Sequence, residues 1–280
     1  MNINFPVEET VKKRYSVRNY KDQAIESDKL KAIEVFIASL ENPFGPNIKF
    51  HTLDIKTGPN TQKLGTYGVI KGASHYIGTT ITPEPLALEA LGYEFEALVL
   101  YLADLGLGTC WLGGTFDRQS FSNAMQIEAG EIFPIITPFG YAADHKHFKE
   151  KAMRKLIKAD QRKEWPQLFF NNDFQSPLTA AAAGDLAFAL EMVRLGPSAS
   201  NKQPWRIVLI DGNCHFYEAK EPGYSKAFSY DIQRVDLGIA AAHFDFAMKE
   251  RKIDGHFITS AQPEIDLPKH MEYVFSWIRA

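Results

Sequence analysis

The sequence predicts an α+β fold made of two diverged copies of one unit. Helix-like and strand-like segments alternate along the 280 residues, and one arrangement of them occurs twice. In each copy a helix leads into a Pro-x-x-x-Asn loop, and an aromatic residue then opens a strand. The loop at residues 43–47 precedes Phe50, and the loop at residues 197–201 precedes Trp205, an offset of 197 − 43 = 154 residues.

The two longest predicted helices repeat in the same order. Ala-Leu-Gly at residues 90–92 matches Asp-Leu-Gly at residues 236–238, an offset of 238 − 92 = 146 residues. Chance coincidences arise in any α+β chain, but two similar offsets in one order favour a duplication. We therefore expect two halves, residues 1–160 and 161–280, that pack as one compact unit.

Length and composition indicate a soluble globular enzyme. The 280 residues are 45% apolar and 23% charged, which suits one large domain or two ordinary ones. The net charge of −3 and the pI near 6.3 give no electrostatic reason to expect nucleic acid or an anionic membrane as a partner.

Several features favour the cytoplasm. Glu8 and Glu9 make the N-terminal segment unlike a signal or transit peptide. Charged residues interrupt the most apolar stretch, residues 86–107, so we expect no membrane-spanning helix. Cys110 and Cys214 form no C-x-x-C pair, which argues against a disulfide scaffold or a zinc site and for a reducing compartment.

Apolar periodicity and turn residues predict the individual elements. In the first half, Ser27 with Asp28 offers an N-cap for the second helix. The helices are expected at residues 8–13, 27 to the stop at 42–43, and 86–105, and the strands at 50–55, 73–81 and 132–139. In the second half, helices are expected at 179–195 and 231–251 and hairpin strands at 205–210 and 214–219, after a basic linker at 145–163.

Two loops contain candidate ligand-binding groups. Arg14, Ser16 and Arg18 follow a short helix, and two guanidinium groups flanking a hydroxyl can bind a phosphate. A solvated basic surface is the simpler alternative for that segment. The loop at residues 197–201 offers hydroxyl and amide groups that suit a flat heteroaromatic ligand or its ribityl chain, although a plain helix-to-strand turn is also compatible.

The glycine-rich turn at residues 106–114 differs from a dinucleotide fingerprint. A Rossmann motif follows a strand and opens a helix, whereas this turn closes a helix. Gly113 and Gly114 instead predict a backbone that approaches a planar group closely, with its N–H groups directed at that group.

No convincing set of nucleophile, base and orienting group is present. Cys110 fits a small buried hydrophobe, and His75 and His243 lie within apolar elements as core histidines often do. His145 and His147 could bind a metal, but lysines surround them, so we expect no metal site. Ligand-binding loops without acid–base machinery point to a cofactor that brings its own chemistry.

These segments resemble motifs of the FMN-dependent nitroreductase family. Residues 14–20, Arg-Tyr-Ser-Val-Arg-Asn-Tyr, are similar to its Arg-x-Ser-x-Arg/Lys-x-aromatic motif. Residues 197–205 look like its Pro-Ser-x-x-Asn-x-Gln-Pro-Trp signature, and residues 106–114 like its Gly-Leu-Gly-x-Cys-Trp-x-Gly turn. The three together span most of the chain. The resemblance implies a nitroreductase-like three-layer sandwich.

The order of the motifs departs from the family. Ordinarily the Pro-Ser-x-x-Asn loop follows the Arg-x-Ser motif by about one helix, but here residues 42–47 occupy that place. In the family's homodimer the flavin lies at the interface, between the Arg-x-Ser segment of one subunit and the loop of the other. The chain thus resembles the double-length branch, a monomer that acts as a fused pseudo-dimer, with further oligomerisation left open. One complete motif set implies one FMN per chain.

Motif position implies the binding residues. Arg14, Ser16 and Arg18 would hold the phosphate or ribityl end, and Arg162 with Lys163 would complete the phosphate site. Ala199 replaces a common serine. The backbone of Gly113 and Gly114 would face the flavin N5, and no side chain is expected to be catalytic. The full set is Arg14, Tyr15, Ser16, Arg18, Thr66, Tyr67, Leu112, Gly113, Gly114, Arg162, Lys163, Pro197, Ser198, Ala199 and Asn201.

The resemblance implies a ping-pong oxidoreductase. NAD(P)H would reduce the flavin, and a small electron acceptor such as a nitroaromatic or a quinone would then take the electrons. Two alternatives stay open: a flavoenzyme of the same fold that acts by dehalogenation or flavin cleavage, and a flavin-binding protein without efficient turnover. In the latter, aromatic residues such as Phe44, Tyr67, Phe170 and Phe174 could cover the open flavin face.

Overall fold

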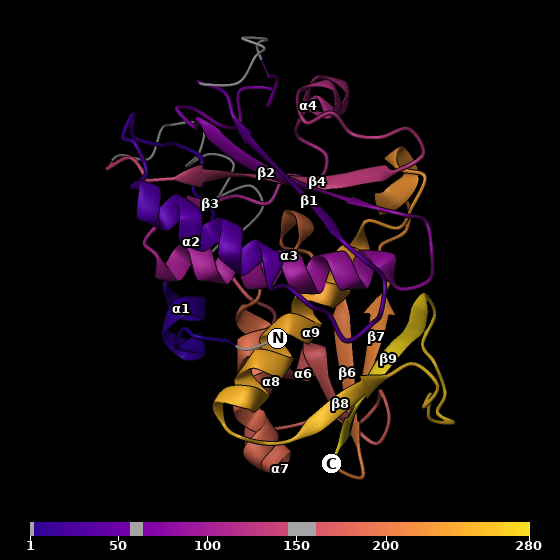
Figure 1. The fold of residues 1–280 in the computed structure, drawn as a ribbon. Helices are drawn as coiled ribbons and strands as arrows, with labels where there is room; N and C mark the ends of the chain where they lie inside the picture. Colours follow the sequence, from indigo (N-terminus) through magenta and orange to yellow (C-terminus); the bar gives the residue numbers. More distant parts are fainter. Residues whose placement is uncertain (1–2, 57–63, 145–160) are drawn as a thin grey trace.

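Two β-sheets enclose a layer of helices in the computed structural model, which describes residues 3–56, 64–144 and 161–280 (Figure 1). The first sheet has the order β1-β2-β4-β3, and all its neighbours are antiparallel. Its strands are β1 Lys49–Asp54, β2 His75–Ile81, β3 Gly108–Thr109 and β4 Ile132–Gly140. All of them come from the first half of the chain.

The second sheet comes from the second half and has the order β5-β6-β7-β9-β8. Only β5 and β6 run parallel, and the other neighbours are antiparallel. Its strands are β5 Phe169–Asn171, β6 Trp205–Ile210, β7 Asn213–Ala219, β8 Gly255–Ile258 and β9 Met271–Arg279.

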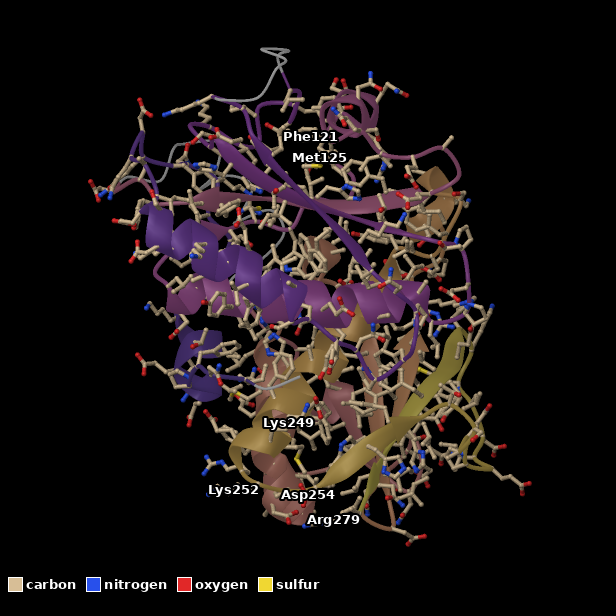
Figure 2. The ribbon with its side chains drawn as sticks, viewed as in Figure 1. Phe121, Met125, Lys249, Lys252, Asp254 and Arg279 are labelled. Atoms are coloured by element: carbon tan, nitrogen blue, oxygen red, sulfur yellow. The ribbon has the colours of Figure 1, made fainter. Side chains whose placement is uncertain are left out.

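The helices of the central layer lie between the sheets (Figure 1). They are α1 Val7–Lys13, α2 Ser27–Ala38, α3 Ala87–Asp104, α8 Ala187–Leu195 and α9 Gln233–Glu250. The other described helices are α4 Arg118–Ala124, α6 Trp165–Leu168, α7 Ala180–Ala183, η1 Gly184–Leu186, η2 Ala199–Asn201 and η3 Tyr224–Ala227. Helix α4 covers the outer face of the first sheet, where Phe121 and Met125 belong to a separate apolar cluster (Figure 2).

The two halves meet where α3 crosses α9. A Cβ atom added at Gly92 would lie 2.1 Å from the Val235 carbonyl oxygen, and one at Gly238 would lie 2.0 Å from the Glu89 carbonyl oxygen. The two contacts are equivalent in the sequence repeat. Gly238 corresponds to Gly92 and Val235 to Glu89, each at the 146-residue offset. The helices therefore pack backbone to backbone about a pseudo-twofold axis.

The loop at residues 42–47 shows how the halves diverged. Phe44 packs into the second half, with its ring centroid 5.6 Å from that of Phe257 and 5.0 Å from that of Phe275. Asn42 holds the loop on α3 by donating a 2.6 Å hydrogen bond to Glu94. At the 154-residue offset the counterpart of Phe44 is Ser198, so an aromatic side chain in one copy corresponds to a hydroxyl in the other.

Most predicted elements are confirmed to within a few residues, and so are the α+β class and its two halves. The continuous helix at 179–195 was wrong, because Gly184 adopts a φ of +57° and separates α7 from α8. The N-cap at Ser27 was also wrong: Ser27 is the first helical residue, and Glu26 precedes it. Strands β5, β8 and β9 were not expected. Most of the predicted linker, with His145 and His147, lies outside the described residues.

The described helices are all too short or too polar to cross a membrane. Cys110 and Cys214 are buried and form no disulfide, and the burial of Cys110 was predicted.

We predict that Gly92→Ala destabilises the protein. Alanine would normally favour a helix interior by about 1 kcal/mol, but here its methyl group would clash with the Val235 carbonyl. The expected net loss is about 1–3 kcal/mol of unfolding free energy, the range for overpacked cores, measured by urea denaturation. Gly114→Ala is the control, because its methyl would lie at an ordinary 3.5 Å from Phe228. Equal stability of the two variants would contradict the close crossing.

Candidate ligand-binding site

A cavity of about 380 Å³ lies between the two halves. Its volume is in the range of small-molecule and cofactor sites. The first half contributes Val11, Lys12, Arg14, Tyr15, Ser16, Arg18, Trp111, Gly113 and Ile135. The second half contributes Arg162, Leu195, Pro197, Ser198, Ala199, Ser200, Asn201, Ile232, Val235, Asp236 and Ile239. Neither half forms this cavity alone.

The basic end of the cavity is fixed by the segment after α1. The chain becomes extended at Arg14, and the Val17 amide donates a 2.7 Å hydrogen bond to the Thr109 carbonyl beside the glycine turn. Arg18 is only 7% exposed, and its Nε and Nη1 atoms are buried without a hydrogen-bond partner in the described part of the chain. A buried guanidinium with unsatisfied donors is costly, so this end favours an anionic ligand that would accept those hydrogen bonds.

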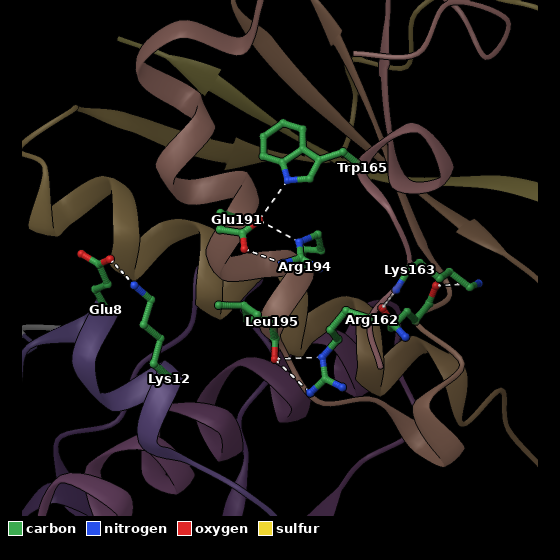
Figure 3. Close-up of polar contacts among 9 residues, drawn as sticks. Glu8, Lys12, Arg162, Lys163, Trp165, Glu191, Arg194 and Leu195 are labelled. Carbon is green, nitrogen blue, oxygen red and sulfur yellow. Dashed lines mark hydrogen bonds and ion pairs between the residues drawn. The ribbon is translucent and has the colours of Figure 1, made fainter. Parts of the chain in front are cut away.

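Arg162 brings a second-half guanidinium to the same cavity. Its Nε and Nη2 atoms lie 3.3 and 3.2 Å from the Leu195 carbonyl oxygen (Figure 3), and its Nη1 donates to Asn201 Oδ1 at 3.1 Å. Lys163 lies outside the cavity, where its Nζ contacts the Gln203 carbonyl at 3.4 Å. Burial, with Arg206 nearby, lowers the pKa of Lys163 to about 8.

The loop after α8 is held in an uncommon backbone conformation. Ser200, Asn201 and Gln203 have φ values of 49°, 56° and 47°, in the left-handed region. Hydrogen bonds stabilise this geometry: the Gln203 amide donates to Ser198 Oγ at 2.8 Å, and the Asn201 side chain donates to the Gln161 carbonyl at 2.7 Å. Strained loops of this kind cluster at binding sites, where they preorganise ligand contacts.

Asp236 is a lining residue that our sequence reasoning missed. Its carboxyl accepts the Ala199 amide at 3.0 and 3.2 Å, and the residue is only 3% exposed. Burial raises the pKa of Asp236 well above its ordinary value. The sequence repeat could have identified it. Asp236 is equivalent to Ala90 at the 146-residue offset, and a carboxyl group at a buried helix position needs a hydrogen-bond partner.

One face of α9 forms the apolar wall. Ile232, Val235 and Ile239 follow the three- and four-residue spacing of a helix face and line the cavity with Ile135. Trp111 also lines the cavity, and its indole donates to Glu96 at 2.9 Å. Glu96 also pairs with His243 at 2.8 Å, which gives this fully buried core histidine the partner that its context predicted.

The predicted binding residues divide into two groups. Those that line the cavity are Arg14, Tyr15, Ser16, Arg18, Gly113, Arg162, Pro197, Ser198, Ala199 and Asn201. Those that do not are Thr66, Tyr67, Leu112, Gly114 and Lys163. Their ligand contacts stay predictions. The structure adds lining residues outside the predicted set: Val11, Lys12, Trp111, Ile135, Leu195, Ser200, Ile232, Val235, Asp236 and Ile239.

The four aromatic residues that could have covered the open flavin face do not line the cavity. Phe44 and Phe174 pack within the second half, Phe170 contacts Phe174, and Tyr67 is 72% exposed. The described residues also contain no cluster of three or more potential metal ligands.

Comparisons with known proteins agree on one family. The family model described as "Putative TM nitroreductase" matches residues 6–248. A crystal structure of a putative nitroreductase from Thermotoga maritima is similar over 100% of this chain and 96% of that chain, with 20% identity and a TM-score of 0.61. This similarity supports the fold alone. No curated protein matches this sequence.

Two further solved structures resemble only about half of the chain. A nitroreductase family protein from Clostridium difficile 630 covers 55% of this chain and 92% of its own, with 22% identity and a TM-score of 0.42. A Bacteroides fragilis nitroreductase with bound FMN covers 52% and 94%, with 20% identity and a TM-score of 0.40. These scores are too low to carry an argument.

We predict that Asp236→Asn makes the folded state less sensitive to pH. A raised carboxyl pKa means that the folded state retains a proton that the unfolded state has lost, so stability falls as pH rises above the unfolded value of 3.8. Asparagine cannot ionise and still accepts the Ala199 amide. Urea denaturation should show a gain of about 1 kcal/mol or more at pH 8 and little difference at pH 4. A loss of stability at pH 8 would show that the ionised carboxylate is needed.

Proposed function

This chain belongs to the family described as "Putative TM nitroreductase", and on that premise we propose that it is an FMN-dependent oxidoreductase. The observation that carries the proposal is the cavity itself, in which arginine side chains and an apolar wall meet at the junction of the halves. FMN has a dianionic phosphate and a polar ribityl chain, which suit the arginine and serine side chains, and a flat ring system, which suits the apolar wall.

The residues present fit this cofactor. The unsatisfied donors of Arg18 need acceptors, and phosphate oxygens supply them in charge-assisted hydrogen bonds. Arg14 and Arg162 reach the same cavity from opposite halves. Ser198 and Ser200 offer hydroxyls on the loop that faces this end. We propose that this set holds the phosphate and ribityl chain.

The apolar part of the lining suits a ring system. Ile232, Val235 and Ile239 give an apolar surface that excludes water, and Gly113 lets the backbone approach closely. When bound, FMN supplies two-electron hydride chemistry at N5. The chain's own part is to bind the cofactor, orient it and place backbone N–H groups along its edge. We propose that NAD(P)H is the reductant and that nitroaromatics or quinones are the acceptors, in a ping-pong cycle.

The pseudo-symmetry predicts a single site. We propose two halves at residues 1–160 and 161–280 within one compact cytoplasmic monomer, with one cofactor at their junction. The pseudo-twofold axis relates the position of Ser198, which lines the cavity, to that of Phe44. Phe44 instead packs against Phe257 and Phe275. Because an aromatic side chain occupies the position of that hydroxyl, we propose that no second flavin binds there.

We predict one FMN per chain in the purified protein. The ratio of flavin absorbance to protein concentration after reconstitution with excess FMN and gel filtration measures it. A ratio near two would refute the single site, and a ratio near zero would refute the cofactor assignment.

We predict that Arg18→Ala weakens FMN binding by about ten- to a hundredfold. Losing one charge-assisted interaction costs about 1.5–3 kcal/mol, and the ratio of dissociation constants follows from that energy. Fluorescence titration of the FMN-free protein with FMN gives both constants. Asn47→Ala is the matched control in the first-half loop, where Asn47 is exposed, and it should leave FMN binding unchanged. Equal losses in the two variants would argue against the site.

We predict parallel lines in steady-state plots when NADPH and a quinone are varied together. Anaerobic mixing with NADPH should bleach the flavin rapidly. Intersecting lines would contradict a ping-pong cycle, and slow bleaching with either NADPH or NADH would identify a flavin-binding protein without efficient turnover.

A further inference from the structure

Arg118 holds the glycine turn from outside the cavity. It begins α4, and its Nε donates to the Phe133 carbonyl at 2.7 Å. Its Nη2 donates to the Gly113 carbonyl at 2.7 Å and lies 3.1 Å from the Pro134 carbonyl oxygen. The rigid fork of a guanidinium therefore joins the glycine turn to the strand β4, which runs behind the cavity wall.

The same guanidinium reaches the second half of the chain. Its Nη2 lies 3.3 Å from the Tyr230 hydroxyl, and its Cζ lies 5.6 Å from the ring centroid of Phe228. The ring of Phe116, from the first half, lies 4.8 Å away. Arg118 is thus packed between aromatic rings of both halves, an arrangement that an ammonium group does not reproduce.

The peptide between Gly113 and Gly114 is the group that this contact orients. The C=O of Gly113 and the N–H of Gly114 belong to one planar trans peptide, so they point in opposite directions. Two glycines in sequence would otherwise let this peptide rotate at little cost. Because Arg118 binds the carbonyl, the direction of the Gly114 N–H is also fixed.

The Gly114 amide has no hydrogen-bond acceptor in the described part of the chain. Across residues 3–56, 64–144 and 161–280, no backbone or side-chain group accepts a hydrogen bond from the Gly113 or Gly114 amide. Gly113 lines the cavity, so the peptide that follows it starts at the cavity wall. A fixed donor without an internal acceptor at this edge is suited to a hydrogen-bond acceptor on the bound ring.

We propose that Arg118 is a positioning residue that tunes the redox potential of bound FMN by fixing the Gly113–Gly114 peptide. The inference rests on the proposed function. A backbone donor at N5 stabilises the oxidised flavin, whose N5 has a lone pair and no proton. When Arg118 no longer holds the peptide, the donor is less well aligned, the oxidised form loses stabilisation, and the midpoint potential rises.

The test replaces Arg118 with lysine, which keeps the charge but cannot reproduce the fork. Arg279→Lys is the matched control: Arg279 also pairs through two nitrogens, with Asp185, but lies at the end of the molecule opposite α4 (Figure 2). The first measurement is amide hydrogen exchange over residues 112–116 in FMN-free protein. The second is the midpoint potential of bound FMN.

We expect the Arg118→Lys variant to exchange the Leu112 amide, which donates to the Ile136 carbonyl at 2.9 Å beside the turn, at least tenfold faster. We also expect the ratio of its affinities for oxidised and reduced FMN to fall about tenfold, which for a two-electron couple is a rise of about 30 mV. Arg279→Lys should change neither. Arg118→Gln, which keeps one donor, should give intermediate values and replaces the lysine variant if that variant does not fold.

Two results would overturn the inference. Unchanged exchange would show that Arg118 does not fix the peptide, and faster exchange with an unchanged potential would show that the peptide does not act on N5. A wild-type protein that binds no FMN would instead refute the proposed function, and the exchange measurement, made without FMN, separates that outcome from the others.

Discussion

The contact on which the structure depends is the backbone crossing of α3 and α9. Gly92 and Gly238 leave no side chain between the helices, so each main chain touches the carbonyl of the other. This short separation brings the Ile232 face of α9 against the first-half glycine turn, 3.5 Å from where a Gly113 side chain would begin. A bulkier crossing would part the two walls of the cavity. The cavity is therefore a consequence of how closely the two helices approach.

The two halves of the chain contribute different groups to the cavity. The first half supplies Arg18 and the glycine turn, and the second supplies the strained loop and the apolar helix face. Each part is held by contacts away from the cavity: Arg118 holds the turn, and Asp236 holds the loop through the Ala199 amide. Rigid support of this kind fixes ligand-binding groups before a ligand arrives.

Sequence reasoning found the local patterns and missed the contacts between distant segments. Periodicity and spacing predict the repeat, the long helices and the two candidate ligand-binding segments, because each of these depends on residues that are close in sequence. The role of Asp236 depends on a contact with Ala199, 37 residues away, and that of Arg118 on one with Tyr230, 112 residues away. Strand β9 pairs with β7, more than fifty residues earlier, and its pattern alone shows no partner. The break at Gly184 needs a left-handed glycine in a run of alanines, where local propensity favours a continuous helix.

Phe44 and Ser198 show what joining two copies in one chain permits. In a symmetric homodimer a substitution enters both interfaces at once, so one residue would have to fill a core and line a ligand site together. Here the two positions differ: Phe44 belongs to an aromatic cluster, and Ser198 lines the cavity. In a single chain the two equivalent positions can hold different residues. The residue that packs in the second half therefore need not be the same as the one that lines the cavity.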